Sequence, residues 1–378
     1  MRKSVLKALP LAKPLAVAAA LACALVGQAQ AQTNVTIYGR VDAGINYQSN
    51  QVNKNADGSI TRGGQWGIGG NEWGTSMFGI KGTEDLGGGL KALFTLENGF
   101  DASNGQVNGG SGLWTRRSFV GLNGSLGTVK IGRDLALPSD RVWSIDPTGQ
   151  QNMSTSTLFK GRNWPQTSNQ IQYITPDMGG LYVHVMYGAG EAAGSFTRGP
   201  TGSNIGNSTG IAVGFVQPTY ELLAMYDTAR SQSGEYNDLF SRSKEITVGG
   251  NVTFGPAKLF AGWQNISAPA QDTSTAVAGS MASANKANQF WLGANYQVTP
   301  ALTLIGAAYH VKLNHDVGSA NLFMVGTNYS LSKRTLLYAS VGTIRNGSNT
   351  DFQVQTGSSD GLVGQNQSTF YTGISHSF

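Results

Sequence analysis

The sequence has little of what ordinary globular proteins depend on. A single cysteine among 378 residues excludes a disulfide framework and any metal site built from several thiolates. Charged residues make up only 12% of the chain, about half the usual share, and the four histidines show no metal-ligand spacing. From these absences we expect no bound metal and no other cofactor.

Acidic residues are absent from the first 31 positions, which carry four basic residues. A short apolar run at 14–27 and small residues at 29–31 follow, in the order typical of a cleaved secretory signal peptide. We therefore predict a signal peptide at 1–31 and one mature domain at 32–378. The alternative, a lipid-modified N-terminus at Cys23, fits less well because Ala20 stands where a leucine is usual.

The rest of the chain has almost no net charge. It contains 22 basic and 21 acidic residues, although the whole sequence carries a formal charge of +5. Recognition of nucleic acid relies on clustered positive charge, so we expect no nucleic-acid partner.

Long apolar runs are also missing after residue 31, since none approaches the roughly 18 residues that a membrane-spanning helix needs. What recurs instead is alternation of apolar and polar residues, the period of a β-strand with two unlike faces. It is clear at 35–47, 246–254 and 290–298. In the second of these segments, Ile246, Val248 and Val252 oppose Thr247 and Asn251.

The alternation predicts sixteen strands, joined in turn by short and long connections. The strands are expected at about 35–57, 75–84, 90–101, 114–123, 128–134, 169–176, 181–190, 209–217, 219–229, 242–254, 257–265, 287–298, 302–312, 320–331, 335–346 and 367–378. The long connections are rich in Gly, Ser and Asn and are expected at about 48–74, 102–113, 135–168, 191–208, 230–241, 266–286, 314–319 and 347–366.

A sheet can cross hydrocarbon only by closing on itself, because every backbone polar group in lipid must be bonded internally. Strands of about 9–11 residues with short periplasmic turns and long outer loops are typical of such barrels. A pair of soluble β-sandwiches is the alternative, but it does not explain the secretion signal, the loop asymmetry and the low charge together. We therefore expect an all-β fold, a 16-stranded antiparallel transmembrane β-barrel with short periplasmic turns and long extracellular loops.

Short motifs at both ends of the chain occur in a fixed order. They are VTIYGRVD at 35–42, SMFGIKGTEDLG at 76–87, TRRSFVGL at 115–122 and FYTGISHSF at 370–378. Together they resemble the beta-proteobacterial branch of the Gram-negative general porin family. The last motif, with Ile374, His376 and Phe378 on the expected lipid face, resembles the signal that the outer-membrane barrel assembly machinery recognises.

The resemblance implies a general diffusion porin in the outer membrane of a Gram-negative bacterium. Such a protein is a homotrimer surrounded by outer-membrane lipid, and its water-filled channel passes ions and small hydrophilic solutes passively. The resemblance also implies that the third outer loop, at about 135–168, folds into the barrel and faces a basic wall.

The predicted pore constriction comprises Arg40, Lys81, Arg116, Lys130, Asp140 and Asp146. Arg40 and Arg116 follow from the resemblance, whereas strand parity places Lys81 and Lys130 on the lumen face. Met77 stands where the family usually has an arginine, so we expect only a weak preference for anions.

Enzyme-like patterns are present but lack their structural context. The GSSDG at 357–361 matches a nucleophile elbow without the helix that must follow it, and 188–193 mimics a dinucleotide fingerprint with the same defect. We therefore expect no enzymatic activity, with a barrel hydrolase as the minor alternative. A substrate-specific channel is the other alternative, and it would need an ordered ladder of aromatic or charged residues in the lumen.

Overall fold

The computed structural model describes residues 34–54, 60–108, 112–190, 206–271, 273, 276–355 and 362–378. The predicted signal peptide at 1–31 and the GSSDG motif at 357–361 lie outside the described residues. Within the described part of the chain, no helix is both long enough and apolar enough to cross a membrane.

Among the described residues, seventeen strands form one continuous sheet. They are β1 (Asn34–Lys54), β2 (Ile60–Gly70), β3 (Ser76–Gly87), β4 (Leu90–Phe100), β5 (Arg117–Gly124), β6 (Gly127–Leu135), β7 (Gln166–Ile174), β8 (Leu181–Gly188), β9 (Ser208–Gln217), β10 (Tyr220–Ala229), β11 (Lys244–Phe254), β12 (Ala257–Ser267), β13 (Lys286–Gln297), β14 (Leu302–Leu313), β15 (Gly318–Ser330), β16 (Thr335–Asn346) and β17 (Gln367–Ser377). Four short helices interrupt the connections that the structure describes: α2 (Leu137–Arg141), η1 (Val142–Ser144), α3 (Thr155–Leu158) and η2 (Met281–Ser283).

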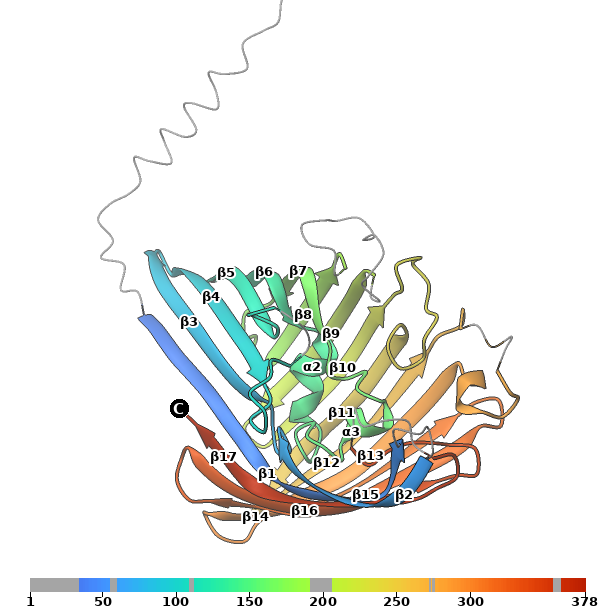
Figure 1. Ribbon diagram of the computed structural model, residues 1–378. Helices are drawn as coiled ribbons and strands as arrows, with labels where there is room; N and C mark the ends of the chain where they lie inside the picture. The colour runs from blue at the N-terminus through green and yellow to red at the C-terminus, as the bar shows by residue number, and fades with distance from the viewer. Residues whose placement is uncertain are drawn as a thin grey trace, which may run out of the picture.

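The sheet closes on itself through its first and last strands (Figure 1). β1 pairs antiparallel with β17, from Arg40 opposite Ser377 to Gln48 opposite Thr369. Beyond this ladder, Gly39 and Phe378 exchange two backbone hydrogen bonds of 3.1 Å. The closure pairs β1 with β17 and so joins the first and last strands of the sheet, while β2 pairs only with β1 among the described strands.

β2 is a difference from the sequence prediction, which placed 60–70 inside a long loop. Both β2 and β3 pair antiparallel with β1. β3 pairs with residues 34–40 of β1, and β2 pairs with residues 43–54. The two therefore continue each other as one interrupted barrel strand, split at residues 71–75. The barrel is thus a closed antiparallel barrel of sixteen strands, as predicted, and its second strand is assigned as two strands.

Side chains alternate between the two surfaces of the barrel wall. On β11, Ile246 and Val248 are 41% and 48% exposed on the outer surface, while Glu245 and Thr247 are fully buried inside. An apolar outer surface of this kind suits hydrocarbon. Phe78 of β3 and Val129 and Ile131 of β6 are likewise exposed.

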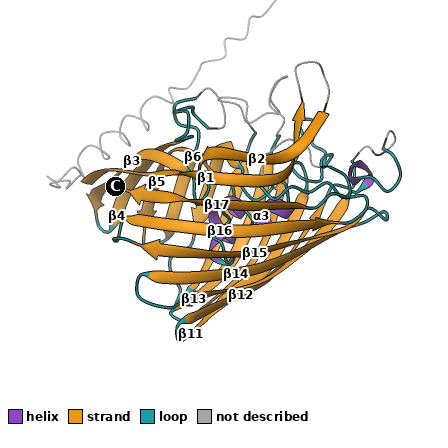
Figure 2. Cartoon of the chain, turned by 60° about the horizontal axis from the view of Figure 1, so that its bottom comes forward, coloured by secondary structure: helices purple, strands orange, loops and turns teal. Residues whose placement is uncertain are grey.

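Connections alternate in length around the barrel, as the sequence predicted, with two exceptions: the long loop expected at 48–74 contains β2, and the connection after β14 is short. Residues 314–317 between β14 and β15 make a tight turn, in which His315 and Asp316 adopt positive φ angles of 56° and 57°. The expected long loop at 314–319 is therefore wrong. The connection from β6 to β7, residues 136–165, enters the barrel and carries α2, η1 and α3 (Figures 1 and 2). We call it the lumen loop.

Candidate functional site

The lumen loop lies against one side of the barrel interior, the inner faces of β8–β17, which we call the covered wall. Six apolar side chains of the loop are completely buried there: Leu137, Val142, Ile145, Met153, Leu158 and Phe159. They pack against large inward residues of the strands, among them Met225, Trp291 and Ile344. The main apolar core of this barrel is therefore inside the lumen, between the loop and the covered wall.

Strand glycines make room for the loop. A side chain at Gly293 would collide with Pro147, and one at Gly342 would collide with Met153. Gly249 likewise has no space for a side chain beside Ile145. The covered wall is thus shaped to receive this particular loop.

Hydrogen bonds fix the loop backbone to the same strands. The indole N–H of Trp291 donates to the carbonyl of Ile145 at 2.9 Å, and the amide of Gln289 donates to the carbonyl of Thr155 at 3.1 Å. These bonds satisfy carbonyl groups that are buried away from water, which would otherwise be costly. The position of the loop is therefore well determined.

A buried ion cluster holds the end of the loop. Arg162 of the loop contacts Asp227 of β10, and its Nη1 lies 3.4 Å from Glu245 of β11. Its Nε also donates to Ser243 at 3.1 Å. Burial alone would lower the pKa of Arg162, but the two carboxylates raise it above its ordinary value. The guanidinium therefore stays charged, and it fixes this end of the loop to the covered wall.

The opposite side of the interior, the inner faces of β1–β6, remains open to water, and we call it the open wall. A cavity of about 870 Å³ lies between this wall and the lumen loop. Arg40 of β1 and Arg116 and Arg117 at the start of β5 line it from the wall, and Asp140 and Trp143 line it from the loop. This cavity is a part of the lumen that the loop leaves free.

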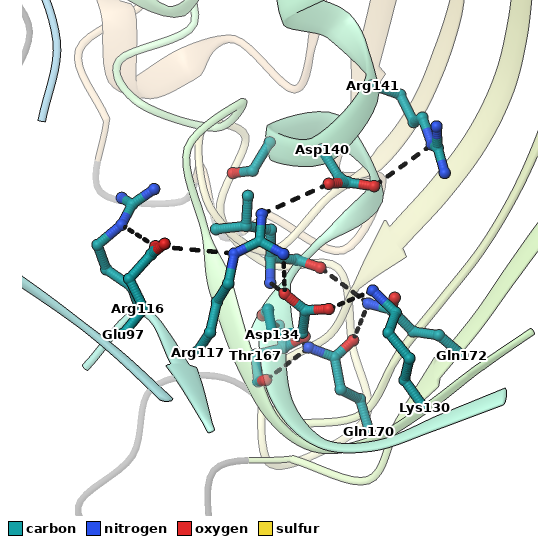
Figure 3. A network of polar contacts seen from close by, with 12 residues as sticks. Glu97, Arg116, Arg117, Lys130, Asp134, Asp140, Arg141, Thr167, Gln170 and Gln172 are labelled. Atoms are coloured by element: carbon teal, nitrogen blue, oxygen red, sulfur yellow. Dashed lines mark hydrogen bonds and ion pairs between the residues drawn. The ribbon is translucent and has the colours of Figure 1, made fainter. Parts of the chain in front are cut away.

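Arg117 is the centre of a charge network that joins the open wall to the loop (Figure 3). Its guanidinium lies 3.0 Å from Asp134 of β6, and 3.7 Å from both Glu97 of β4 and Asp140 of α2. Arg116 donates to the same Glu97 at 2.7 Å. The network therefore sets how far the loop stands from the wall.

The two signs of charge differ in exposure within this network. The side chains of Glu97 and Asp134 are only 5% and 2% exposed, whereas those of Arg116 and Arg117 are 19% and 23% exposed. Asp140 is the exposed acid, at 21%. Burial would raise the pKa of Asp140, but Arg141, Lys130 and Arg117 together hold it below its ordinary value. The surface in contact with water is therefore mainly cationic.

Of the six residues predicted at the constriction, Arg40, Arg116 and Asp140 line the cavity. Lys81 is exposed on β3, where its Nζ lies 5.0 Å from the centre of the Tyr38 ring. Lys130 is 9% exposed and paired with Asp134, so its charge is neutralised locally.

Asp146 does not face the channel, which corrects its predicted place. It is 2% exposed inside the lumen loop, where its carboxylate accepts bonds from the backbone N–H groups of Thr148 at 2.8 Å and Thr155 at 2.9 Å. The hydroxyl of Tyr309 donates to it at 3.1 Å. Because its oxygens are used within the loop, Asp146 shapes the loop and does not contribute to the water-facing surface.

The three residues of the predicted assembly signal lie on the outer surface of the barrel. Ile374 and Phe378 are each 45% exposed, and His376 is exposed beside Thr335 with a 2.9 Å contact between Nδ1 and Oγ1. The ring of Phe378 occupies the space above Gly39, where a side chain would collide with it.

The sequence prediction missed four charged residues of the site, namely Glu97, Arg117, Asp134 and Glu72. Glu97 was detectable, because it is a lone carboxylate on the inward parity of β4. Arg117 was not detectable from the sequence. Alternation along a strand points only one of two adjacent residues toward the lumen, but β5 begins at Arg117, so Arg116 lies outside the strand and both side chains border the cavity.

Comparison with known proteins identifies the family. The family model described as Gram-negative porin matches residues 16–349. The chain belongs to the Gram-negative porin family. Outer membrane porin protein 32 of Delftia acidovorans is 30% identical to this porin. The alignment covers 93% of this porin and 96% of the relative. Another outer membrane porin protein, from Bordetella pertussis, is 28% identical, and the alignment covers 85% of this porin and 91% of that relative.

Solved structures agree with this assignment. An anion-selective porin from Comamonas acidovorans superposes with a TM-score of 0.73 and 26% identity, covering 92% of this porin and 100% of that chain. OmpF of Salmonella typhi shares the fold, with a TM-score of 0.62 and 16% identity, covering 91% of this porin and 97% of that chain. The predicted family, barrel fold and outer-membrane location are confirmed, and this porin forms a channel in the outer membrane of a Gram-negative bacterium.

Proposed function

We propose that this porin is a general diffusion channel with a weak preference for anions. Small hydrophilic solutes pass through the cavity between the open wall and the lumen loop. The guanidinium groups of Arg40, Arg116 and Arg117 attract anions there, and Asp140 opposes them from the loop. Short-range attraction without tight binding allows a solute both to enter and to leave.

One observation carries this proposal: the side chains of Arg116 and Arg117 are partly exposed, at 19% and 23%, whereas those of Glu97 and Asp134 are buried. A passing ion therefore meets arginine charge first, since Glu97 and Asp134 lie behind it. The nearly neutral sum of charges keeps the preference weak. The anion-selective character named for the Comamonas acidovorans porin, at 26% identity, supports the same sign.

Assembly and export are part of the proposal. The chain is made with a cleaved signal peptide at 1–31, and the strand ending in Phe378 is presented to the barrel assembly machinery. Long connections then face outward and both termini face the periplasm. We also propose a homotrimer, and OmpT of Vibrio cholerae, which has a similar fold, has been solved in a trimer form.

We propose no catalytic role, because the relatives of this porin are channel proteins. Hydrolysis of a phospholipid or peptide by the purified protein would overturn this. Cross-linking or native mass measurement that finds only monomers would overturn the trimer.

The selectivity is tested in planar lipid bilayers with a KCl gradient. The zero-current potential should indicate a weak anion preference, and Arg40→Ala or Arg116→Ala should move it toward cations. Asp140→Asn should move it further toward anions. Asp146→Asn is the matched control, because it removes the same carboxylate charge behind the water-facing surface and should leave the potential unchanged. A wild-type channel that prefers cations contradicts the proposal.

A further inference from the structure

The cavity at the constriction has aromatic as well as cationic lining. Trp73, Trp143 and Trp164 all border it, the first beside the open wall and the other two from the lumen loop. Trp143 is 56% exposed, which is unusual for so large an apolar side chain inside a channel unless something covers it. An exposed indole in the lumen is poorly hydrated, and its flat face can stack with the aromatic ring of a solute.

Hydrogen bonds hold two of these indole rings in place. The N–H of Trp143 donates to the carbonyl of Asp140 at 3.0 Å, and the N–H of Trp164 donates to the carbonyl of Gln150 at 2.9 Å. Both polar ends are therefore occupied by the loop itself. What remains for a solute is the apolar ring surface, held in a fixed orientation.

Two guanidinium groups on the open wall offer hydrogen-bond donors to the same cavity. The Nε of Arg40 donates a hydrogen bond to the carbonyl of Thr75 at 3.0 Å, and the Nε of Arg116 donates to the carboxylate of Glu97. Within the described part of the chain, the terminal nitrogens of these two arginines have no hydrogen-bond partner. Paired N–H donors of this kind match the two oxygens of a carboxylate.

Met77 separates the two arginines. It lies opposite Arg40 of β1 in the ladder and opposite Gly99 of β4, and the side chain of Arg116 packs over Gly99. An uncharged residue therefore lies between the two arginines in the sheet, where a third cation would favour compact, highly charged anions. Methionine sulfur instead makes favourable contacts with aromatic rings.

We propose that the cavity is a transient binding site for aromatic monocarboxylates, of which benzoate is the simplest. The carboxylate accepts from the terminal nitrogens of Arg40 and Arg116, and the ring stacks on Trp143. This inference rests on the proposed diffusion function and names a preferred class of solute for it. A volume of about 870 Å³ is in the range of small-molecule sites, so one such anion fits together with water.

The test uses the purified mature protein in planar bilayers at constant ionic strength. The chloride current is recorded while sodium benzoate, sodium cyclohexanecarboxylate, sodium acetate or neutral benzamide is added. Benzoate should reduce the current at a concentration about ten-fold lower than acetate does, with cyclohexanecarboxylate between them, since the ring adds stacking to the same charge contact. Benzamide should have little effect because it lacks the charge.

Substitutions identify the stacking residue. Trp143→Ala should raise the half-blocking concentration of benzoate about three- to ten-fold, and Trp143→Phe should restore most of the effect. Trp66→Ala is the matched control, because Trp66 is an exposed indole of β2 that does not border the cavity, and it should change nothing.

The outcomes separate this inference from the proposed function. Equal block by benzoate and acetate, with anion preference intact in KCl, overturns the aromatic site and leaves the diffusion channel standing. A channel without anion preference that benzoate still blocks overturns the proposed selectivity alone. Block by benzamide as strong as by benzoate overturns the role given to Arg40 and Arg116.

Discussion

The two sides of the barrel interior differ in what their side chains contact. On the open wall, β1–β6, inward residues such as Arg40 and Glu97 are polar and border the cavity or its charge network. On the covered wall, inward residues such as Met225 and Trp291 are large and apolar, and the lumen loop buries them. One half of the interior behaves as a wet surface and the other half as a protein core.

The difference between the two walls shows that the interior of such a barrel is not polar throughout. β10 carries apolar residues on both faces, since Leu222 and Tyr226 are exposed outside while Leu223 and Met225 are buried inside, between the inward acids Glu221 and Asp227. An apolar residue on the lumen parity therefore indicates where a loop is going to pack. The wall with fewer large apolar residues on this face is the one that water and solutes reach.

Removing the loop should produce the largest change in the channel. Replacing 140–160 by a short Gly-Ser linker should raise single-channel conductance about two-fold or more, because the loop fills much of the lumen cross-section. Conductance steps in planar bilayers measure this. The same replacement at 231–235, in an outer connection, is the control and should leave conductance near the wild-type value. If the deletion changes neither conductance nor selectivity in a folded barrel, the loop does not form the constriction.

Removing Arg162 should destabilise the covered wall strongly. Arg162→Met leaves Asp227 and Glu245 buried without a cation, a loss of about 3–5 kcal/mol in the free energy of unfolding. Thermal unfolding followed by circular dichroism measures the loss. Combining Arg162→Met with Asp227→Asn and Glu245→Gln removes the excess charge and should recover much of the stability. A single variant as stable as the wild type would show that the cluster does not hold the loop.

Filling one glycine site should have a smaller effect. Gly342→Leu forces the new side chain into Met153, and overpacking of this kind costs about 1–3 kcal/mol. We expect a lower unfolding temperature and a noisier current as the loop shifts. Gly306→Leu is the matched control, because a side chain at Gly306 meets open space. Equal behaviour of the two variants would argue against the fit between loop and wall.

Acidification should change selectivity slightly before it affects Asp140. Burial raises the pKa of Glu72, which borders the cavity from the segment between β2 and β3, whereas the pKa of Asp140 is lowered by its cationic neighbours. As pH falls, Glu72 is neutralised first, so the anion preference should rise slightly in the zero-current potential. Glu72→Gln should abolish this rise. A rise that persists in that variant would assign it to another group.

The strands were largely predictable from the sequence, and the lumen loop was not. Period-two alternation depends only on which surface of the wall a residue contacts, so it marked fifteen barrel strands within a few residues and, of the second barrel strand, only β3. β2 was missed because its five glycines, among them Gly63 and Gly64, look like a loop. The path of the loop depends on contacts between distant residues, such as Ile145 with Trp291, for which no local pattern exists.

The same distinction applies to the site. Arg40 and Arg116 were found from motifs, whereas Asp146 was misplaced because a carboxylate in a polar loop gives no sign that it will be buried. The grouping of Trp73, Trp143 and Trp164 around one cavity was also out of reach, since the first lies far from the other two in sequence.

The pairing of Phe378 with Gly39 has a consequence for how the barrel forms. The last residue of the chain bonds to one of its first described residues, so the contact joins the most distant parts of the sequence. Closure therefore needs both β1 and β17, and contacts of such high sequence separation form slowly. A chain that ends early leaves the edges of β1 and β16 unpaired, which hydrocarbon does not tolerate. Sealing of the barrel thus depends on two strands from opposite ends of the described residues, β1 and β17.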